Sequence, residues 1–92
     1  MPSPSLPARL GVVCVVLGDR EHAARINAII SDFERLIIGR IGVPYRQRKV
    51  GVIALLVEGD TDAMGAFTGR LGAVPGVKIR TALFNEADVP AA

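Results

Sequence analysis

The sequence predicts an α+β domain with the ferredoxin-like order βαββαβ, a four-stranded antiparallel sheet and two helices on one face. Three observations support this fold class. Two strand-length runs, Leu10–Leu17 and Val50–Val57, are apolar almost throughout, as central strands are. Each run is followed by an amphipathic helical pattern. Val77–Leu83 alternates apolar and charged residues, which is typical of a sheet edge.

The first half of the domain is a strand followed by a helix. Leu10–Leu17 is rich in β-branched residues, and Gly18 ends it. Asp19 is a favourable N-cap residue for the helix that follows. Apolar side chains then recur at helical spacing, so one helix face should pack on the sheet. They are Ala23, Ile26, Ile29, Ile30 and Phe33.

A pair of strands joined by a polar hairpin comes next. Leu36–Val43 is the first of them, and its Gly39 and Gly42 predict a bulge or a close neighbour. Pro44 ends this strand or places it at an edge, because proline cannot donate a ladder hydrogen bond. Residues 45–49, YRQRK, form the connection to Val50–Val57.

The last helix and strand complete the predicted order. Asp60 or Thr61 should cap the helix, and Pro75–Gly76 should form a turn before the strand Val77–Leu83. The side chains expected to face the core are Met64, Phe67, Leu71, Val74, Val77, Ile79 and Leu83. Lys78 and Arg80 should point outward.

The chain of 92 residues is long enough for one small domain. We place this domain at residues 9–84, between flexible tails at residues 1–8 and 85–92. Residues 1–8 lack the apolar core of a signal peptide, and the apolar runs are too short to span a bilayer. We therefore expect a cytoplasmic protein with no membrane partner.

The two central strands predict self-association. Both are apolar on both faces, but the two helices can cover only one face of the sheet. Side chains such as Val12, Val16 and Leu56 would then form a large apolar patch in water. We expect a homo-oligomer, a dimer or a tetramer, that assembles through the sheet.

Few residues point to metal binding or catalysis. The chain holds one histidine, His22, among charged residues at a helix start, and one cysteine, Cys14, within an apolar strand. We expect no metal, no cofactor and no catalytic residue, so the protein should not be an enzyme. A catalytic alternative would need His22 or Tyr45 in a pocket.

The hairpin is basic, with Arg40, Arg46, Arg48 and Lys49, although the net charge is only +2. Ferredoxin-like sheets that bind RNA present aromatic side chains on the open face, whereas these strands offer aliphatic ones. We do not expect nucleic acid to be a partner. Contact with DNA phosphates through Arg46, Arg48 and Lys49 stays open as an alternative.

The second helix carries Gly65, Gly69 and Gly72 along one stripe, each weakening a helix by about 1 kcal/mol relative to alanine. Close packing on its own sheet or on another subunit explains the stripe most simply. The alternative is a ligand against exposed backbone at Gly65, Thr68 and Gly69.

A second candidate ligand position is the turn between the first strand and the first helix. This turn comprises Gly18, Asp19 and Arg20. The N-terminus of the helix that follows could receive a carboxylate or another anion.

Four segments carry a family resemblance: Asp19–Glu21, Arg40–Tyr45, Gly65–Gly72 and Gly76–Thr81. With them the chain resembles the small bacterial proteins described as proposed regulators of iron-only hydrogenase systems, from the first strand to Thr81. The resemblance implies an ACT-like fold similar to the C-terminal ligand-sensing domain of nickel-responsive regulators. It also implies assembly through the sheet.

Together these features predict a non-enzymatic, oligomeric ACT-like regulator of an iron-only hydrogenase or redox system. It would sense a small-molecule effector at a subunit interface. Two alternatives stay open: a structural protein–protein interaction module without a ligand, and a DNA-binding transcriptional regulator that uses the basic hairpin.

Overall fold

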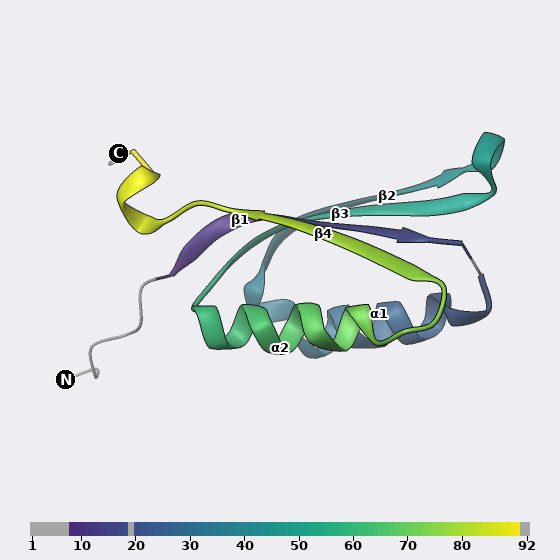
Figure 1. Cartoon of the computed structure of the whole chain (residues 1–92), viewed down its shortest axis with the longest axis horizontal. Helices are drawn as coiled ribbons and strands as arrows, with labels where there is room; N and C mark the ends of the chain where they lie inside the picture. The colour runs from purple at the N-terminus through teal and green to yellow at the C-terminus, as the bar shows by residue number, and fades with distance from the viewer. Residues whose placement is uncertain (1–7, 19, 91–92) are drawn as a thin grey trace.

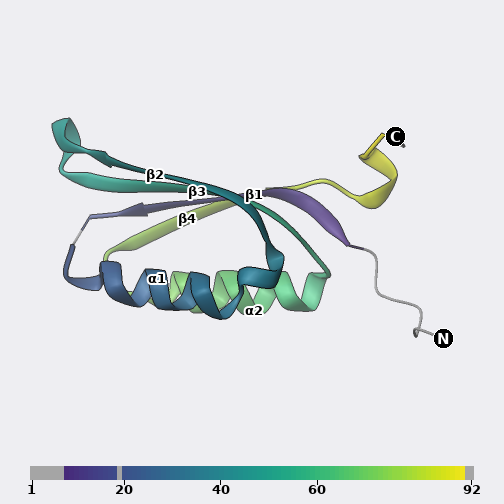
Figure 2. The ribbon, with the colours of Figure 1, turned by 180° about the vertical axis from the view of Figure 1, so that it is seen from behind.

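The computed structural model describes residues 8–18 and 20–90, which form one sheet covered by two helices (Figure 1). The elements are β1 (Arg9–Leu17), α1 (Ala23–Asp32), β2 (Ile37–Tyr45), β3 (Val50–Gly59), α2 (Thr61–Gly72) and β4 (Val77–Leu83). The strand order is β2-β3-β1-β4, with every neighbouring pair antiparallel. Figures 1 and 2 show both helices on the same side of the sheet. The predicted ferredoxin-like fold is confirmed.

The core lies between the sheet and the helices. Val13, Val15 and Leu55 of the central strands are buried against Ile26 of α1 and Phe67 of α2. The rings of Phe33 and Phe67 stack at a tilt, with 5.1 Å between their centroids. The side chains predicted to face the core from α2, together with Val74, are all buried. Helical periodicity alone therefore identified the face of α2 that packs on the sheet.

Strand β2 differs from its prediction at both ends. It runs to Tyr45, with Pro44 inside it, because β2 is the edge strand and proline there interrupts no second ladder. The predicted bulge is present, since the register with β3 shifts between Ile37 and Gly39. Tyr45, which the sequence places in the hairpin connection, instead pairs with Val50 of β3. The prediction that the sheet strands offer only aliphatic side chains is therefore wrong by this one aromatic residue.

The sheet face opposite the helices, called the open sheet face from here on, carries an apolar surface. The cross-strand register places on it Ile41, Val43, Tyr45, Val50, Val52, Ala54, Leu56, Leu10, Val12, Cys14, Val16, Lys78, Arg80 and Ala82. Ile41 is 67% exposed and Leu56 is 54% exposed. Lys78 and Arg80 of β4 border the apolar side chains along one side.

Within residues 8–18 and 20–90, four short 3-10 segments join or follow the main elements: Arg20–His22, Glu34–Leu36, Arg46–Arg48 and Glu86–Asp88. The first leads into α1, for which His22 stands at the N-cap position without a side-chain cap bond. The cap predicted for Asp19 lies outside the described residues. The expected tails stay a prediction, and Glu86–Asp88 is the secondary structure that the described part of them contains. Among the described residues, no helix has the length and apolar character needed to cross a bilayer.

Candidate functional site

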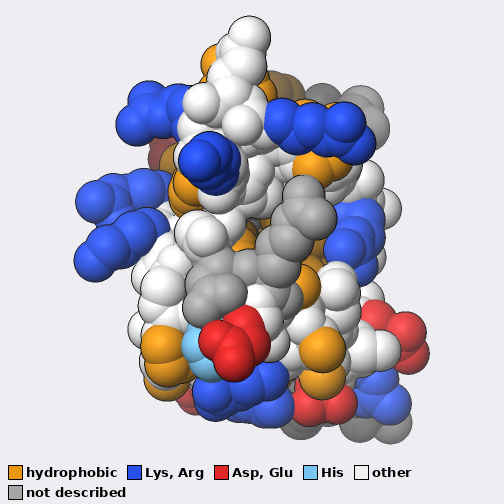
Figure 3. Space-filling view, turned by 90° about the vertical axis from the view of Figure 1, so that its right-hand side faces the viewer, with side chains coloured by type: hydrophobic (Ala, Val, Ile, Leu, Met, Phe, Trp, Pro, Cys, Tyr) orange, Lys and Arg blue, Asp and Glu red, His pale blue; other side chains and the backbone are white. Residues whose placement is uncertain are grey.

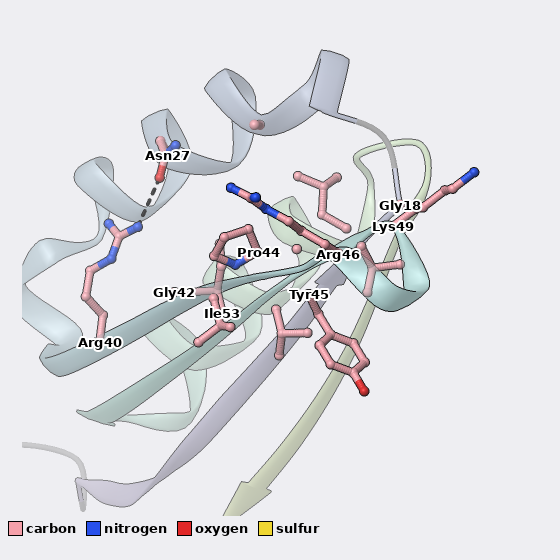
Figure 4. Close-up of a pocket in the computed structure, with 15 residues that line it drawn as sticks. Gly18, Asn27, Arg40, Gly42, Pro44, Tyr45, Arg46, Lys49 and Ile53 are labelled. Atoms are coloured by element: carbon pink, nitrogen blue, oxygen red, sulfur yellow. Dashed lines mark hydrogen bonds between the residues drawn. The ribbon is translucent and has the colours of Figure 1, made fainter.

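A pocket of about 540 Å³ opens between the start of α1 and the β2–β3 hairpin (Figure 4). Its described lining comes from β1, α1, β2, the hairpin and β3. Figure 1 shows the hairpin rising away from the helix layer at this end of the molecule. The volume of the pocket lies within the range of typical small-molecule sites.

The pocket exists because small residues meet where large apolar ones would otherwise fill the core. On β2 and β3, Gly42 pairs with Ile53 and Pro44 pairs with Gly51, on the same side of the sheet as the buried Leu55. A Cβ atom built at Gly42 would meet no heavy atom within 4 Å. Ala23, the first residue of α1, adds only a methyl group. The sheet and α1 are thus left apart at this corner.

The pocket's charged lining is cationic. Arg40, Arg46 and Lys49 line it, and among its described lining residues there is no Asp or Glu. Arg40 donates a hydrogen bond from Nη2 to Oδ1 of Asn27 on α1, with 3.1 Å between the atoms. Figure 4 shows Arg46 reaching over Pro44 towards α1, whereas the Lys49 side chain extends away from the pocket on the other side of the hairpin. The pocket therefore offers guanidinium groups and an amide to a bound molecule.

The sequence around the pocket explains this charge. Residues 35–57 include Arg35, Arg40, Arg46, Arg48 and Lys49 but no Asp or Glu. Figure 3, which views this end of the molecule, shows Lys and Arg side chains around its upper part, over the sheet layer. Neither Arg46 nor Lys49 has an ion pair or side-chain hydrogen bond with any described residue. Their charges are free to attract an anion.

The pocket is continuous with the open sheet face around the edge strand. Val43, Tyr45, Val50 and Val52 belong to the open sheet face and also line the pocket. The Tyr45 ring points away from the pocket in Figure 4. A molecule in the pocket would therefore lie beside residues that an assembly through the sheet would cover.

Residues 9–81 match the model of the TM1266-like family, described as a proposed iron-only hydrogenase system regulator. The chain belongs to this family. It is also similar to the solved structure of the uncharacterized protein TM1266 from Thermotoga maritima, with 33% sequence identity and a TM-score of 0.79. That similarity covers 85% of this chain and 99% of the other. No curated protein matches the sequence. The resemblance inferred from the motifs is confirmed at the level of this family.

The six positions predicted to bind a ligand in this TM1266-like protein do not form one site. Gly18 lines the pocket, whereas Asp19 lies outside the described residues and Arg20 begins the 3-10 segment before α1. Gly65, Thr68 and Gly69 lie on α2 and are absent from the described lining of the pocket. Whether any of the six binds a ligand stays a prediction.

The glycine stripe of α2 faces solvent in the described part of the chain. Gly65 and Gly69 are exposed, and a Cβ atom at either would have no contact within 4 Å. At Gly72 a Cβ would meet Ile79 Cδ1 at 3.7 Å, an ordinary van der Waals distance. Close packing of α2 on its own sheet is therefore wrong as the reason for these glycines. The Thr68 hydroxyl donates a hydrogen bond to the Met64 carbonyl oxygen at 2.9 Å, so its proton is already bonded to the backbone of its own helix.

Of the residues considered for metal binding or catalysis, Tyr45 lines the pocket, although its ring points away from it in Figure 4. His22 and Cys14 are both partly buried, and neither is among the described residues that line the pocket. Cys14 sits on the open sheet face, paired with Ala54 and Arg80, rather than in the main core. No cluster of three or more His, Cys, Asp and Glu side chains suited to a metal ion occurs among the described residues.

Sequence reasoning missed most of this pocket. Asn27, Gly42, Pro44 and Gly51 line it and were not predicted as site residues. One signal was available, because Gly42 and Pro44 alternate with the apolar residues Ile41 and Val43 in β2. That signal predicts a bulge or an edge equally well, so only the packing of α1 against the hairpin distinguishes a pocket from a simple edge.

Proposed function

We propose that this TM1266-like protein is a non-enzymatic, homo-oligomeric ACT-like regulator of an iron-only hydrogenase system. It assembles through the open sheet face and responds to a small molecule bound between α1 and the β2–β3 hairpin. The observation that carries the proposal is the open sheet face itself, in a member of a family described as regulators.

The energetic argument for assembly is the exposure of large hydrophobic side chains on that face. Ile41, Val43, Tyr45 and Leu56 are 67%, 48%, 43% and 54% exposed. Covering apolar surface is favourable by about 25 cal/mol per Å². Contiguous patches of this kind mark interaction sites in proteins. A second copy offers the same apolar centre, and a two-fold arrangement would satisfy both surfaces together.

The link to sensing is the shared residues of the pocket and the open sheet face. An effector changes an equilibrium only through different contacts in the two states. Val43, Tyr45 and Val52 could make such contacts, because they border both the pocket and the proposed interface. Effector binding would then favour one arrangement of subunits.

The non-enzymatic part of the proposal follows from the kinds of side chain in the pocket. Its described lining provides arginine, lysine, asparagine and tyrosine but no His, Cys, Ser, Asp or Glu. Histidine and the carboxylates are the most frequent acid–base residues and serine and cysteine are frequent nucleophiles, so the described lining lacks the usual nucleophile–base pairs.

Two measurements test the proposal. Light scattering of the purified full chain at micromolar concentration should give the mass of a dimer or a tetramer, and a monomer would contradict assembly. Deleting the gene in the source organism should change hydrogenase transcript levels or hydrogenase activity. If both stay at wild-type values, the regulatory role is wrong.

A DNA-binding regulator is the second candidate, favoured by the exposure of Arg46, Arg48 and Lys49 at the hairpin. Gel shifts with DNA from the hydrogenase promoter should then show salt-dependent binding. Neutralising all three residues should abolish it. If the wild-type protein does not bind at low salt, this candidate is excluded.

A further inference from the structure

The cationic side chains of the pocket lie on two neighbouring parts of the fold. Arg40 is on β2 and Arg46 begins the hairpin, and in Figure 4 both reach towards α1. Arg40 uses one nitrogen to hold Asn27, which leaves its other N–H groups available. Arg46 has no ion pair or side-chain hydrogen bond among the described residues. A planar guanidinium suits carboxylate and phosphate oxygens, which it binds with two parallel hydrogen bonds.

The remainder of the pocket is lined by apolar residues, and no large side chain of a described residue fills it. Leu17, Val50 and Ile53 contribute aliphatic surface, and Gly42 and Pro44 leave room above β2. Inorganic phosphate would use only the cationic part of such a pocket. A molecule with both an anionic group and an apolar body would contact both parts.

We propose that the pocket binds a small organic anion, a carboxylate or a phosphate ester with an apolar body. The anionic group lies at Arg46 and Arg40, and the body lies over Gly42, Pro44 and Ile53. The inference deepens the proposed function and rests on its claim that this pocket receives the effector.

The direct test is a binding titration of the 92-residue chain, monitored by NMR of its backbone amides in low-salt, phosphate-free buffer. The probes are benzoate, phenyl phosphate, neutral benzamide and inorganic phosphate. Benzoate or phenyl phosphate should shift the amides of Gly18, Gly42 and Gly51. The affinity of benzamide should be at least roughly tenfold lower than that of benzoate, because benzamide keeps the ring and lacks the charge. The first two probes distinguish a carboxylate from a phosphate ester.

Three variants locate the binding. Arg46→Gln should weaken binding of the preferred anion roughly tenfold, the usual effect of losing a charge-assisted hydrogen bond. Arg48→Gln removes a cation of the same hairpin that does not line the pocket, so its affinity should match wild type. Gly42→Val adds a side chain where no atom lies within 4 Å of a Cβ, so it should fill the pocket and abolish binding without unfolding the protein.

Several results would overturn the inference. One is equal weakening by Arg46→Gln and Arg48→Gln, which would mean diffuse attraction by the hairpin. Another is wild-type affinity in a folded Gly42→Val variant, and a third is the absence of binding by both organic anions. The mass measured in the same buffer separates the two proposals. An oligomer that binds no anion contradicts only this inference, whereas a monomer that binds benzoate contradicts only the proposed assembly.

Discussion

Single residues determine where α2 begins and how closely two strands approach. Asp60 has extended backbone angles, and its Oδ1 accepts a hydrogen bond from the Ala63 N–H at 2.7 Å. This is the N-cap predicted from the sequence, with Asp60 rather than Thr61 in the role. Gly11 is the other such position, since a Cβ there would lie 2.8 Å from Leu83 Cα of β4. Only glycine allows that approach without displacing backbone.

The first prediction concerns the cap of α2. Asp60→Ala should lower the free energy of unfolding by about 1 kcal/mol, because the Ala63 N–H loses its partner. Asp60→Asn is the matched control, since asparagine caps helices equally well. Chemical denaturation of both variants measures the difference. An alanine variant as stable as the asparagine variant would mean that water replaces the cap without cost.

At the scale of elements, periodicity predicted which face of α2 packs on the sheet. It did not explain why another face of α2 carries glycines. The apolar stripe of α2 was predicted correctly, because a buried helix face places apolar residues every three to four positions in the sequence. The glycine stripe was correct as a pattern and wrong in one of its proposed causes. Small residues mark a close approach only if something lies there, and above Gly65 and Gly69 there is open space.

The second prediction uses these two glycines. The double variant Gly65→Ala, Gly69→Ala should raise the free energy of unfolding by up to about 1 kcal/mol per site, because alanine costs less to order in a helix. It should not change the oligomer mass, since the proposed assembly uses the opposite side of the molecule. Thermal unfolding and light scattering measure the two effects. Loss of assembly in this variant would place a subunit contact on α2 instead of the open sheet face.

At the scale of the whole molecule, the two layers leave one face of the sheet without a covering layer. The apolar character of both faces of β1 and β3 was already visible in the sequence. The structure adds that Ile41 and Leu56 on that face are more than half exposed. This arrangement is the physical reason for proposing that a second copy completes the fold.

The third prediction tests that interface. The double variant Ile41→Lys, Leu56→Lys should reduce the mass in solution to that of a monomer, because burying two unpaired ammonium groups is strongly unfavourable. Ala28→Lys, on an exposed position of α1, is the control and should keep the wild-type mass. Light scattering at several concentrations measures both. A double lysine variant that stays oligomeric would exclude the open sheet face as the interface.

The sequence by itself determined the order of the elements, the strands at the centre of the sheet and the family. Each of these leaves a local record, as a period of two or 3.6 residues, a run of apolar side chains or a motif. The core face of α2 and the cap at Asp60 belong to the same class.

Only the tertiary structure decided where a ligand could bind and what the glycines of α2 face. The pocket results from Gly42 of β2, Gly51 of β3 and Ala23 of α1, small residues on separate elements that leave space where α1 stands off the hairpin. A cavity depends on how elements distant in the sequence pack together, so no local periodicity in the sequence predicts it. The same holds for the solvent above Gly65, because a stripe of glycines shows that a surface is small but not what lies against it.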